Sequence, residues 1–162
     1  FKVVGRLAAT LADPTAVSLA VWFHDAVYDP RRTDNEERST ALAADWLTPL
    51  GLPADTLARV GGLVLATAHL SADHPPADAD TAALLDADLA ILGSAEVRYR
   101  RYAADIRKEY DWVPEAEFRA GRRAVLERFL GRKRIYHTAT LYAEGEEPAR
   151  ANLSAELAGL EG

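Results

Sequence analysis

The sequence predicts an all-α fold in a single domain, and three observations support this prediction. Apolar residues recur at three- and four-residue spacing nearly throughout the 162 residues, which is the period of amphipathic helices. Pro, Gly and Asp separate these segments, and such residues end helices or begin turns. No repeat, low-complexity linker or change of composition divides residues 1–162, and this length suits one domain with its own core.

Four helices are expected in the first half of the chain, over residues 2–11, 17–27, 34–47 and 53–69. Thr15 follows a helix-breaking proline and is placed to cap the second helix. Asp34 is expected to cap the third, because Glu36 and Glu37 then fall in its first turn, where the helix dipole favours carboxylates. Pro53 stands at a position where a helix start tolerates proline.

The second half begins with a polar, proline-containing loop over 71–80. Four more helices are expected over residues 81–92, 96–110, 115–130 and 144–160. Gly93 is expected to end the first of these helices. The last helix carries an apolar stripe, which either packs on the core or pairs with a second subunit in a homodimer. We favour the core.

Composition and charge exclude several classes of protein. No apolar run approaches the roughly 20 residues that a membrane span requires, so we expect no membrane partner. A net charge of −6 and a pI near 5.2 oppose non-specific binding to nucleic acid. The chain has no cysteine, which suits the cytoplasm and leaves only histidine and carboxylate side chains to bind a metal. Gly-rich phosphate loops and serine-nucleophile motifs are also absent from the sequence.

An adjacent histidine and aspartate, His24 and Asp25, lie near the end of the apolar run 17–27. Burial of an unpaired carboxylate is costly or shifts its pKa toward neutrality, so this pair needs a strong partner. An imidazole nitrogen and a carboxylate oxygen suit divalent Mn, Fe, Ni, Co or Zn. The alternatives are a hydrogen-bonded core histidine and an aspartate in a helix-ending turn. Because the two residues occur together after an aromatic pair, we favour a metal site.

Three further positions are candidates for the same site. Asp88 has apolar neighbours at three- and four-residue spacing, so its carboxylate falls on an apolar face and requires a cation, either a metal or an arginine. We favour Asp88 over Asp86 as the metal ligand. His69 ends a long apolar helix, where the helix dipole also stabilises a histidine, so a structural role and a site role are evenly balanced. Glu36 needs no function in a first helical turn, and only its closeness to the His-Asp pair makes it a candidate.

On these residues the chain resembles the HD superfamily of metal-dependent phosphohydrolases, all-helical proteins named for a histidine–aspartate pair. More narrowly, it is similar to a small bacterial branch of that superfamily in the segments 20–28 (AVWFHDAVY), 35–39 (NEERS), 66–69 (ATAH), 84–93 (LLDADLAILG), 106–110 (IRKEY) and 121–122 (GR). The resemblance implies an HD-type domain in which His24, Asp25 and Asp88 bind a divalent transition metal.

The sequence departs from the family pattern at one ligand. The family's first metal histidine lies on the helix before the pair, and no histidine precedes His24 here. The chain begins at Phe1 and contains no methionine, so we expect that histidine to lie upstream of Phe1. The alternatives are a loss of activity or a ligand recruited from His69.

The resemblance also implies metal-assisted hydrolysis of a small phosphorylated substrate, and we favour a nucleotide. A bound metal lowers the pKa of water from 15.7 toward about 7. Asp25 or Glu36 would orient or deprotonate that water, and His69 would hold a phosphate oxygen or donate a proton.

Two arginines, Arg107 and Arg122, are candidates for binding the substrate phosphate. A planar guanidinium matches two phosphate oxygens. For each arginine alone, however, surface charge or a helix ion pair with Glu109 or Glu117 is the better interpretation.

Two other functions compete with hydrolysis. A non-catalytic HD domain would bind a metal or a nucleotide in a regulatory role. Oxidative chemistry at a dinuclear iron site is the third hypothesis, because histidine and carboxylate ligands permit it and relatives of the HD fold perform it. A phosphoester panel with Mn, Co, Ni or Fe separates the first two hypotheses, and oxygen consumption with iron would reveal the third.

Overall fold

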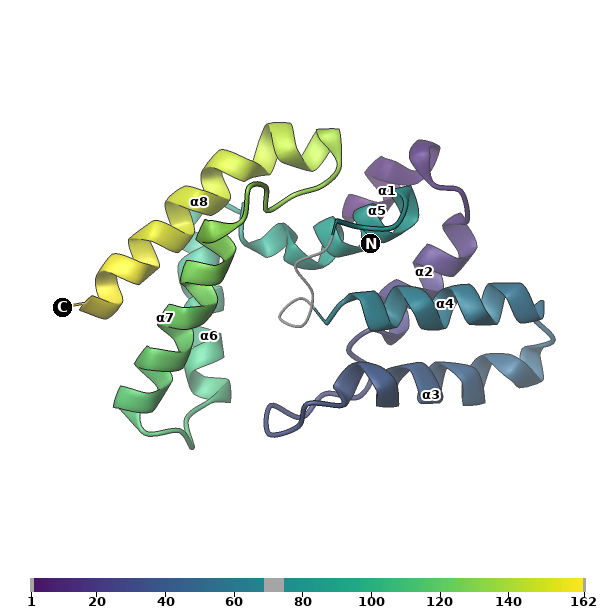
Figure 1. Cartoon of the computed structure of the whole chain (residues 1–162), viewed down its shortest axis with the longest axis horizontal. Coiled ribbons are helices and arrows are strands. Elements are labelled where there is room, and N and C mark those ends of the chain that lie inside the picture. Colours follow the sequence, from purple (N-terminus) through teal and green to yellow (C-terminus); the bar gives the residue numbers. More distant parts are fainter. Residues whose placement is uncertain (1, 69–74, 162) are drawn as a thin grey trace. The chain divides into compact units, whose positions relative to one another are not determined.

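The computed structural model describes residues 2–68 and 75–161 (Figure 1). Within these ranges the chain forms eight α-helices and three short 3-10 helices and contains no strand, which confirms the predicted all-α class. None of these helices combines the length and the apolar character that a membrane crossing needs. The chain divides into two compact units, Phe1–Asp88 and Leu89–Gly162, and each is described by itself. That residues 1–162 form one HD-type domain stays a prediction.

Over its described residues the first unit contains α1 (Lys2–Leu7), η1 (Ala8–Thr10), α2 (Pro14–Phe23), α3 (Asn35–Leu47), η2 (Thr48–Leu50), α4 (Ala54–Ala66) and α5 (Ala79–Asp88), where η denotes a 3-10 helix. α2 is shorter than expected because the chain turns at His24, where the N–H of Ala26 bonds back to the carbonyl of Phe23. α5 begins inside the predicted loop. It does so because the Asp78 carboxylate accepts from the N–H of Thr81 (2.9 Å) and caps the helix.

Two helix caps differ from those expected. Asp13, and not Thr15, caps α2: its Oδ1 accepts a hydrogen bond from the N–H of Ala16 (2.9 Å). The prediction of Thr15 is wrong because a proline fills the first helical position, and the cap belongs before it. Asp34 does precede α3, but its carboxylate accepts from Nε and Nη2 of Arg32 (both 2.6 Å) instead of from the helix.

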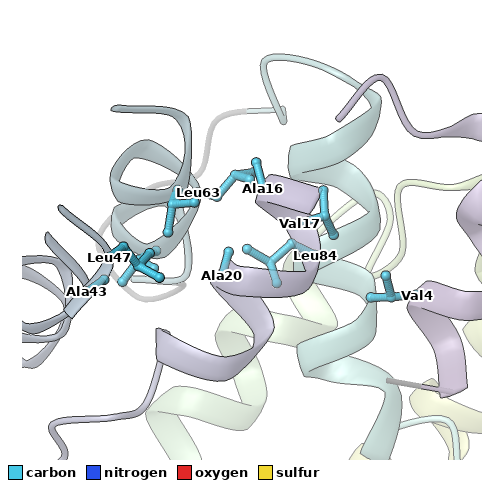
Figure 2. Packing of buried hydrophobic residues seen from close by; sticks show 10 residues of the cluster. Val4, Ala16, Val17, Ala20, Ala43, Leu47, Leu63 and Leu84 are labelled. Carbon is cyan, nitrogen blue, oxygen red and sulfur yellow. The ribbon is translucent and has the colours of Figure 1, made fainter. Parts of the chain in front are cut away.

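The core of the first unit is built around α2 (Figure 2). Two small residues of α2, Ala16 and Ala20, are fully buried, which lets α4 and α5 pack closely against it. Around them lie apolar side chains from α2 and the other helices: Val4, Val17, Ala43, Leu47, Val60, Leu63, Val64 and Leu84. Truncation of a fully buried leucine such as Leu63 to alanine is expected to cost about 2–5 kcal/mol. This packing fixes the position of α2, and with it the end that carries His24.

Over its described residues the second unit contains η3 (Leu89–Ile91), α6 (Glu96–Glu109), α7 (Glu115–Gly131) and α8 (Ala139–Glu161). α6 and α7 lie where the sequence predicts them. α8 begins at Ala139 rather than at 144, and Oγ1 of Thr138 accepts from the N–H of Leu141 (3.3 Å) at that start.

The buried side chain of Tyr136 joins parts of the second unit. Its hydroxyl donates to the carbonyl of Leu89 (3.0 Å) and accepts from the N–H of Gly93 (2.8 Å). Gly145 lies against the ring, where an added Cβ would come within 2.9 Å of Tyr136 Cε2. The Glu146 carboxylate accepts from the N–H of Tyr136 (3.1 Å). The segment before α8 is therefore fixed against η3.

Candidate metal centre

Two helices of the first unit bring the three predicted metal ligands together. His24 follows the last residue of α2, Asp25 comes next, and Asp88 is the last residue of α5. Nε2 of His24 lies 3.3 Å from Oδ1 of Asp88 and 3.5 Å from Oδ2 of Asp25. One ligand atom from each side chain lies within 4.8 Å of the others. Across residues 2–68 and 75–161 this is the one group of three or more such side chains close enough to share an ion.

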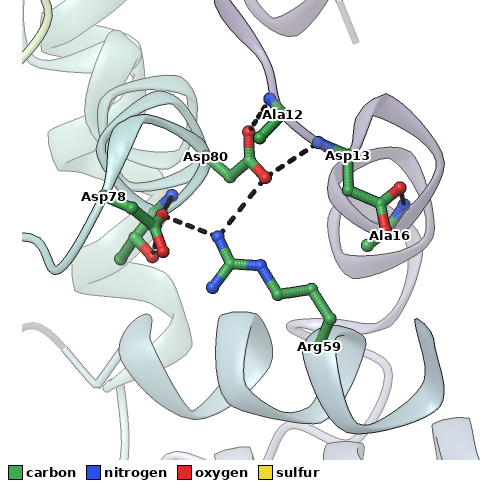
Figure 3. A network of polar contacts seen from close by, with 7 residues as sticks. Ala12, Asp13, Ala16, Arg59, Asp78 and Asp80 are labelled. Atoms are coloured by element: carbon green, nitrogen blue, oxygen red, sulfur yellow. Dashed lines mark hydrogen bonds and ion pairs between the residues drawn. The ribbon is translucent and has the colours of Figure 1, made fainter. Parts of the chain in front are cut away.

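A buried carboxylate at the opposite ends of the same two helices explains why their C-terminal ends meet (Figure 3). Asp80, in the first turn of α5 and 1% exposed, accepts from the N–H groups of Ala12 (2.7 Å) and Asp13 (3.0 Å) just before α2. α2 and α5 both have 10 residues, and each is therefore about 15 Å long. The N-terminal ends are joined at Asp80, and Nε2 of His24 lies 3.3 Å from Oδ1 of Asp88 at the other ends. The two helices of equal length therefore run in the same direction, with their last residues side by side.

Arg59 on α4 strengthens this junction. Its Nη2 lies 2.6 Å from Oδ1 of Asp78 and 3.3 Å from Oδ2 of Asp80 (Figure 3). The hydrogen bond from the guanidinium lowers the pKa of the Asp78 carboxyl to about 2. The positive charge that the buried carboxylate of Asp80 requires is thus supplied within the unit.

The imidazole of His24 is oriented to bind a metal through Nε2. Its Nδ1 lies 3.1 Å from the carbonyl oxygen of Val21. Since a carbonyl only accepts, Nδ1 carries the hydrogen, and in the neutral ring Nε2 then holds the free lone pair. Metal-binding histidines are commonly held in this way, with the second nitrogen donating to a carbonyl or a carboxylate. Nε2 faces the carboxylates of Asp25 and Asp88.

The surroundings of this ring are negative. The hydrogen bond to Asp88, together with the charges of Asp88 and Asp25, raises the pKa of His24 to about 9, although partial burial opposes the shift. The C-terminal ends of α2 and α5 add the negative ends of two helix dipoles. A proton on His24 therefore takes the place of a cation, and metal binding would release it.

The three side chains differ in their exposure to solvent. His24 is 19% exposed and Asp88 25%, whereas Asp25 is 68% exposed. Solvent therefore reaches the group from the side of Asp25. Three protein ligands leave coordination positions open, as in catalytic metal sites. The exposed side is the one from which water or a substrate oxygen would approach.

Two other candidate residues stand apart from this group, and a third lies outside the described residues. Glu36 is half-buried in the first turn of α3 and is not among its members. Asp86 is fully buried on α5 and also lies outside it. Of the two aspartates, Asp88 is thus the one that lies beside His24. His69 lies outside the described residues, and its role stays a prediction.

Arg107 and Arg122, the predicted phosphate clamps, both lie in the second unit. Arg107 donates to the carbonyl of Tyr110 (2.6 Å) and pairs with Glu115 (3.1 Å), next to the turn between α6 and α7. Arg122 is largely buried and forms a bidentate pair with Glu156 (2.7 and 2.9 Å). Each guanidinium thus has a carboxylate partner, and phosphate binding by either arginine stays a prediction.

Sequence reasoning missed Asp80 and Asp13, which set where the two ligand-bearing helices begin. A loop over 71–80 leads one to expect a solvated carboxylate at position 80, whereas Asp80 is buried. The pattern that would have identified it is the pair of aspartates at 78 and 80 directly before an apolar run. Such a pattern is typical of a helix start.

Comparison with known proteins finds no relative for the chain. No family model matches it, and no curated protein or solved structure matches it either. The resemblance to the HD superfamily therefore rests on the sequence segments given for it. The three residues that the resemblance implies as ligands do lie together in the first unit.

Proposed function

We propose that this protein is a metal-dependent phosphohydrolase that acts on a small phosphorylated metabolite, most simply a nucleotide. One observation carries the proposal: Nε2 of His24 lies beside the carboxylates of Asp25 and Asp88, at the negative ends of two helices. One nitrogen and two carboxylate oxygens suit divalent Mn, Fe, Co, Ni or Zn. Such an ion supplies a Lewis acid for a phosphate oxygen and a bound water whose pKa falls from 15.7 toward about 7.

Asp25 is the residue best placed to act on the attacking water. Its carboxylate is the exposed member of the group, so one oxygen can bind the ion while the other accepts a proton from water on the solvent side. His24 and Asp88 are less exposed and would hold the ion. Glu36 is the second candidate base. His69 is the candidate for holding a phosphate oxygen or for donating a proton to the leaving group.

The assignment is tested with His24→Ala and Asp88→Asn in the full-length protein. Asp45→Asn is the control, because Asp45 is exposed on α3 and lies outside the group. After loading with Mn²⁺ or Co²⁺ and removal of free metal, we expect stoichiometric metal in the wild type and the control and little in the two site variants. Phosphate release from a panel of nucleotides and other phosphoesters should follow the metal content. Stoichiometric metal in both site variants would refute the assignment.

A second candidate function is a regulatory HD domain that binds a metal or a nucleotide without turnover. The observation that favours it is that Arg107 and Arg122 both pair with carboxylates, which would compete with a substrate phosphate for the two guanidinium groups. Equilibrium dialysis with a labelled nucleotide distinguishes the two functions. Metal-dependent binding without phosphate release, whichever metal is used, supports the regulatory role.

A further inference from the structure

The segment that leads away from Asp25 is attached to α3 by two side chains. Ser39 accepts a hydrogen bond from the N–H of Val27 (3.0 Å) and donates one to its carbonyl (3.2 Å). Asn35 does the same for Asp29: Oδ1 accepts from the N–H (3.0 Å) and Nδ2 donates to the carbonyl (2.9 Å). Each side chain therefore satisfies both backbone groups of one residue in the segment.

Four hydrogen bonds fix the register of this segment on α3. Val27 and Asp29 are alternate residues of the segment, and Asn35 and Ser39 are one helical turn apart on α3, or about 6 Å along its axis. Each of the two residues in the segment therefore has its own partner on α3. A shift of the segment by one residue would break all four hydrogen bonds.

Burial makes the contacts of Ser39 costly to lose. Ser39 is 0% exposed, so water does not readily replace its hydroxyl. Without that hydroxyl, the N–H and carbonyl of Val27 lose their partner on α3. Since unsatisfied backbone groups are unfavourable away from water, the segment is expected to move until they find other partners.

Asp25 is the ligand whose position depends most on this attachment. The backbone of His24 is still held by α2, because its N–H bonds to the carbonyl of Ala20 (2.9 Å). Asp88 belongs to α5. Asp25 lies beyond the end of α2, in the turn that the N–H of Ala26 closes with the carbonyl of Phe23, two residues before Val27. Its side chain is mostly exposed, and its Oδ2 lies 3.5 Å from Nε2 of His24. The path of the chain after this turn, which Ser39 and Asn35 hold, therefore affects the position of the Asp25 carboxylate more than that of the other two ligands.

We propose that Ser39 and Asn35 are positioning residues of the metal centre, which hold Asp25 beside His24 and Asp88 through the segment 26–29. The proposal rests on the metal-dependent function proposed above. The two side chains act through Asp25 and are not ligands themselves. An attachment that served stability alone would leave the affinity of the folded protein for metal unchanged.

The test measures the affinity for Co²⁺ and the visible absorption of bound Co²⁺ in the full-length protein. Thr40→Val is the matched control, because Oγ1 of the neighbouring Thr40 is buried and has no hydrogen-bond partner among the described residues. We expect Ser39→Ala and Asn35→Ala to bind Co²⁺ about tenfold more weakly and with an altered spectrum. Thr40→Val should stay within about twofold of the wild type, with an unchanged spectrum.

A double-mutant cycle separates positioning from a general loosening of the fold. In the Asp25→Ala background the carboxylate that Ser39 positions is gone, so Ser39→Ala should cause no further loss of Co²⁺ affinity. The same loss in that background would overturn the proposal. Wild-type affinity in both Ser39→Ala and Asn35→Ala would overturn it as well.

The remaining outcomes distinguish this proposal from the proposed function. If Ser39→Ala fails to fold, Asn35→Ala carries the same cycle, because Asn35 is only half-buried. Wild-type protein that binds Co²⁺ but releases no phosphate overturns the hydrolase function and leaves the positioning role supported by the cycle. Wild-type protein that binds no Co²⁺ overturns both.

Discussion

The two ends of the α2–α5 pair both hold carboxylates, but with partners of different chemistry. At the N-terminal ends Asp80 is buried, accepts from backbone N–H groups and bonds to Arg59. At the C-terminal ends Asp25 and Asp88 lie beside His24 and are partly or mostly open to solvent. Arginine stays charged and does not bind metals, whereas histidine can lose its proton and become a ligand. The partner of a carboxylate therefore distinguishes a structural joint from a candidate metal site.

Loss of the junction that Asp80 forms between the N-terminal ends of α2 and α5 is expected to have the largest effect on stability. Asp80→Ala removes the acceptor of the Ala12 and Asp13 N–H groups. It also removes part of the negative charge that faces Arg59. Because a hydrogen bond to a charged group contributes about 1.5–3 kcal/mol, we expect the free energy of unfolding in urea to fall by about 3 kcal/mol. Asp45→Ala should stay within about 0.5 kcal/mol of the wild type, and an equally small change in Asp80→Ala would mean that the helices are not joined there.

At the C-terminal ends of α2 and α5, loss of a carboxylate is expected to change stability little in the metal-free protein and to abolish the stabilisation by metal. Asp88→Asn keeps the size of the side chain and removes both the attraction of Asp88 to His24 and its repulsion from Asp25. Partial exposure screens the attraction, so the metal-free protein should lose about 1 kcal/mol or less. The Tm of the wild type should rise with the concentration of Mn²⁺ or Co²⁺, because an ion bound only to the folded state stabilises it. Calorimetry at graded metal concentrations should show no such rise in Asp88→Asn. An equal rise in both proteins would place the metal elsewhere.

Acid is expected to weaken the ion pair of Asp78 with Arg59, next to the junction of α2 and α5, over a defined range of pH. The pKa of Asp78 is lowered from 3.8 to about 2 by its hydrogen bond to Arg59. The carboxylate therefore contributes stability fully above the unfolded pKa, and this contribution is lost as the pH falls through about 2. The difference in unfolding free energy between the wild type and Asp78→Asn should be constant above about pH 4 and shrink below it.

The size of this acid effect is expected to be modest. Asp78 is partly exposed, so solvent and salt screen its attraction to Arg59. Urea titrations at low and high salt should therefore show a smaller difference at high salt. A difference that persists unchanged down to pH 2 in both salts would show that the ion pair does not stabilise the joint.

The helices were predictable because their sequence patterns are local. Apolar spacing and the flanking Pro and Gly residues place α3, α6 and α7 within one residue of their observed bounds. The junction of α2 with α5 was not predictable in this way, because Asp80 bonds to residues 67 and 68 positions away. No local pattern specifies such a partner. The sequence could therefore name the helices but not how these two are joined.

In the candidate site, too, local features were predictable from the sequence and long-range contacts were not. Adjacent His24 and Asp25 were identifiable from their residue types, and the apolar neighbours of Asp88 favoured it over Asp86. The role of Ser39 was not identifiable, because the partners of backbone groups in an irregular segment depend on the path of the chain in space. Sequence segments can thus indicate candidate metal ligands before they indicate which residues would hold those ligands in place.

Anomalous diffraction from crystals of the full-length protein soaked with Zn²⁺ tests the metal centre most directly. We expect one strong peak, bound by Nε2 of His24 and by carboxylate oxygens of Asp25 and Asp88 at roughly 2.0–2.2 Å. A peak elsewhere at saturating Zn²⁺, with Nε2 of His24 still hydrogen-bonded to Asp88, would contradict the assignment of these residues as metal ligands.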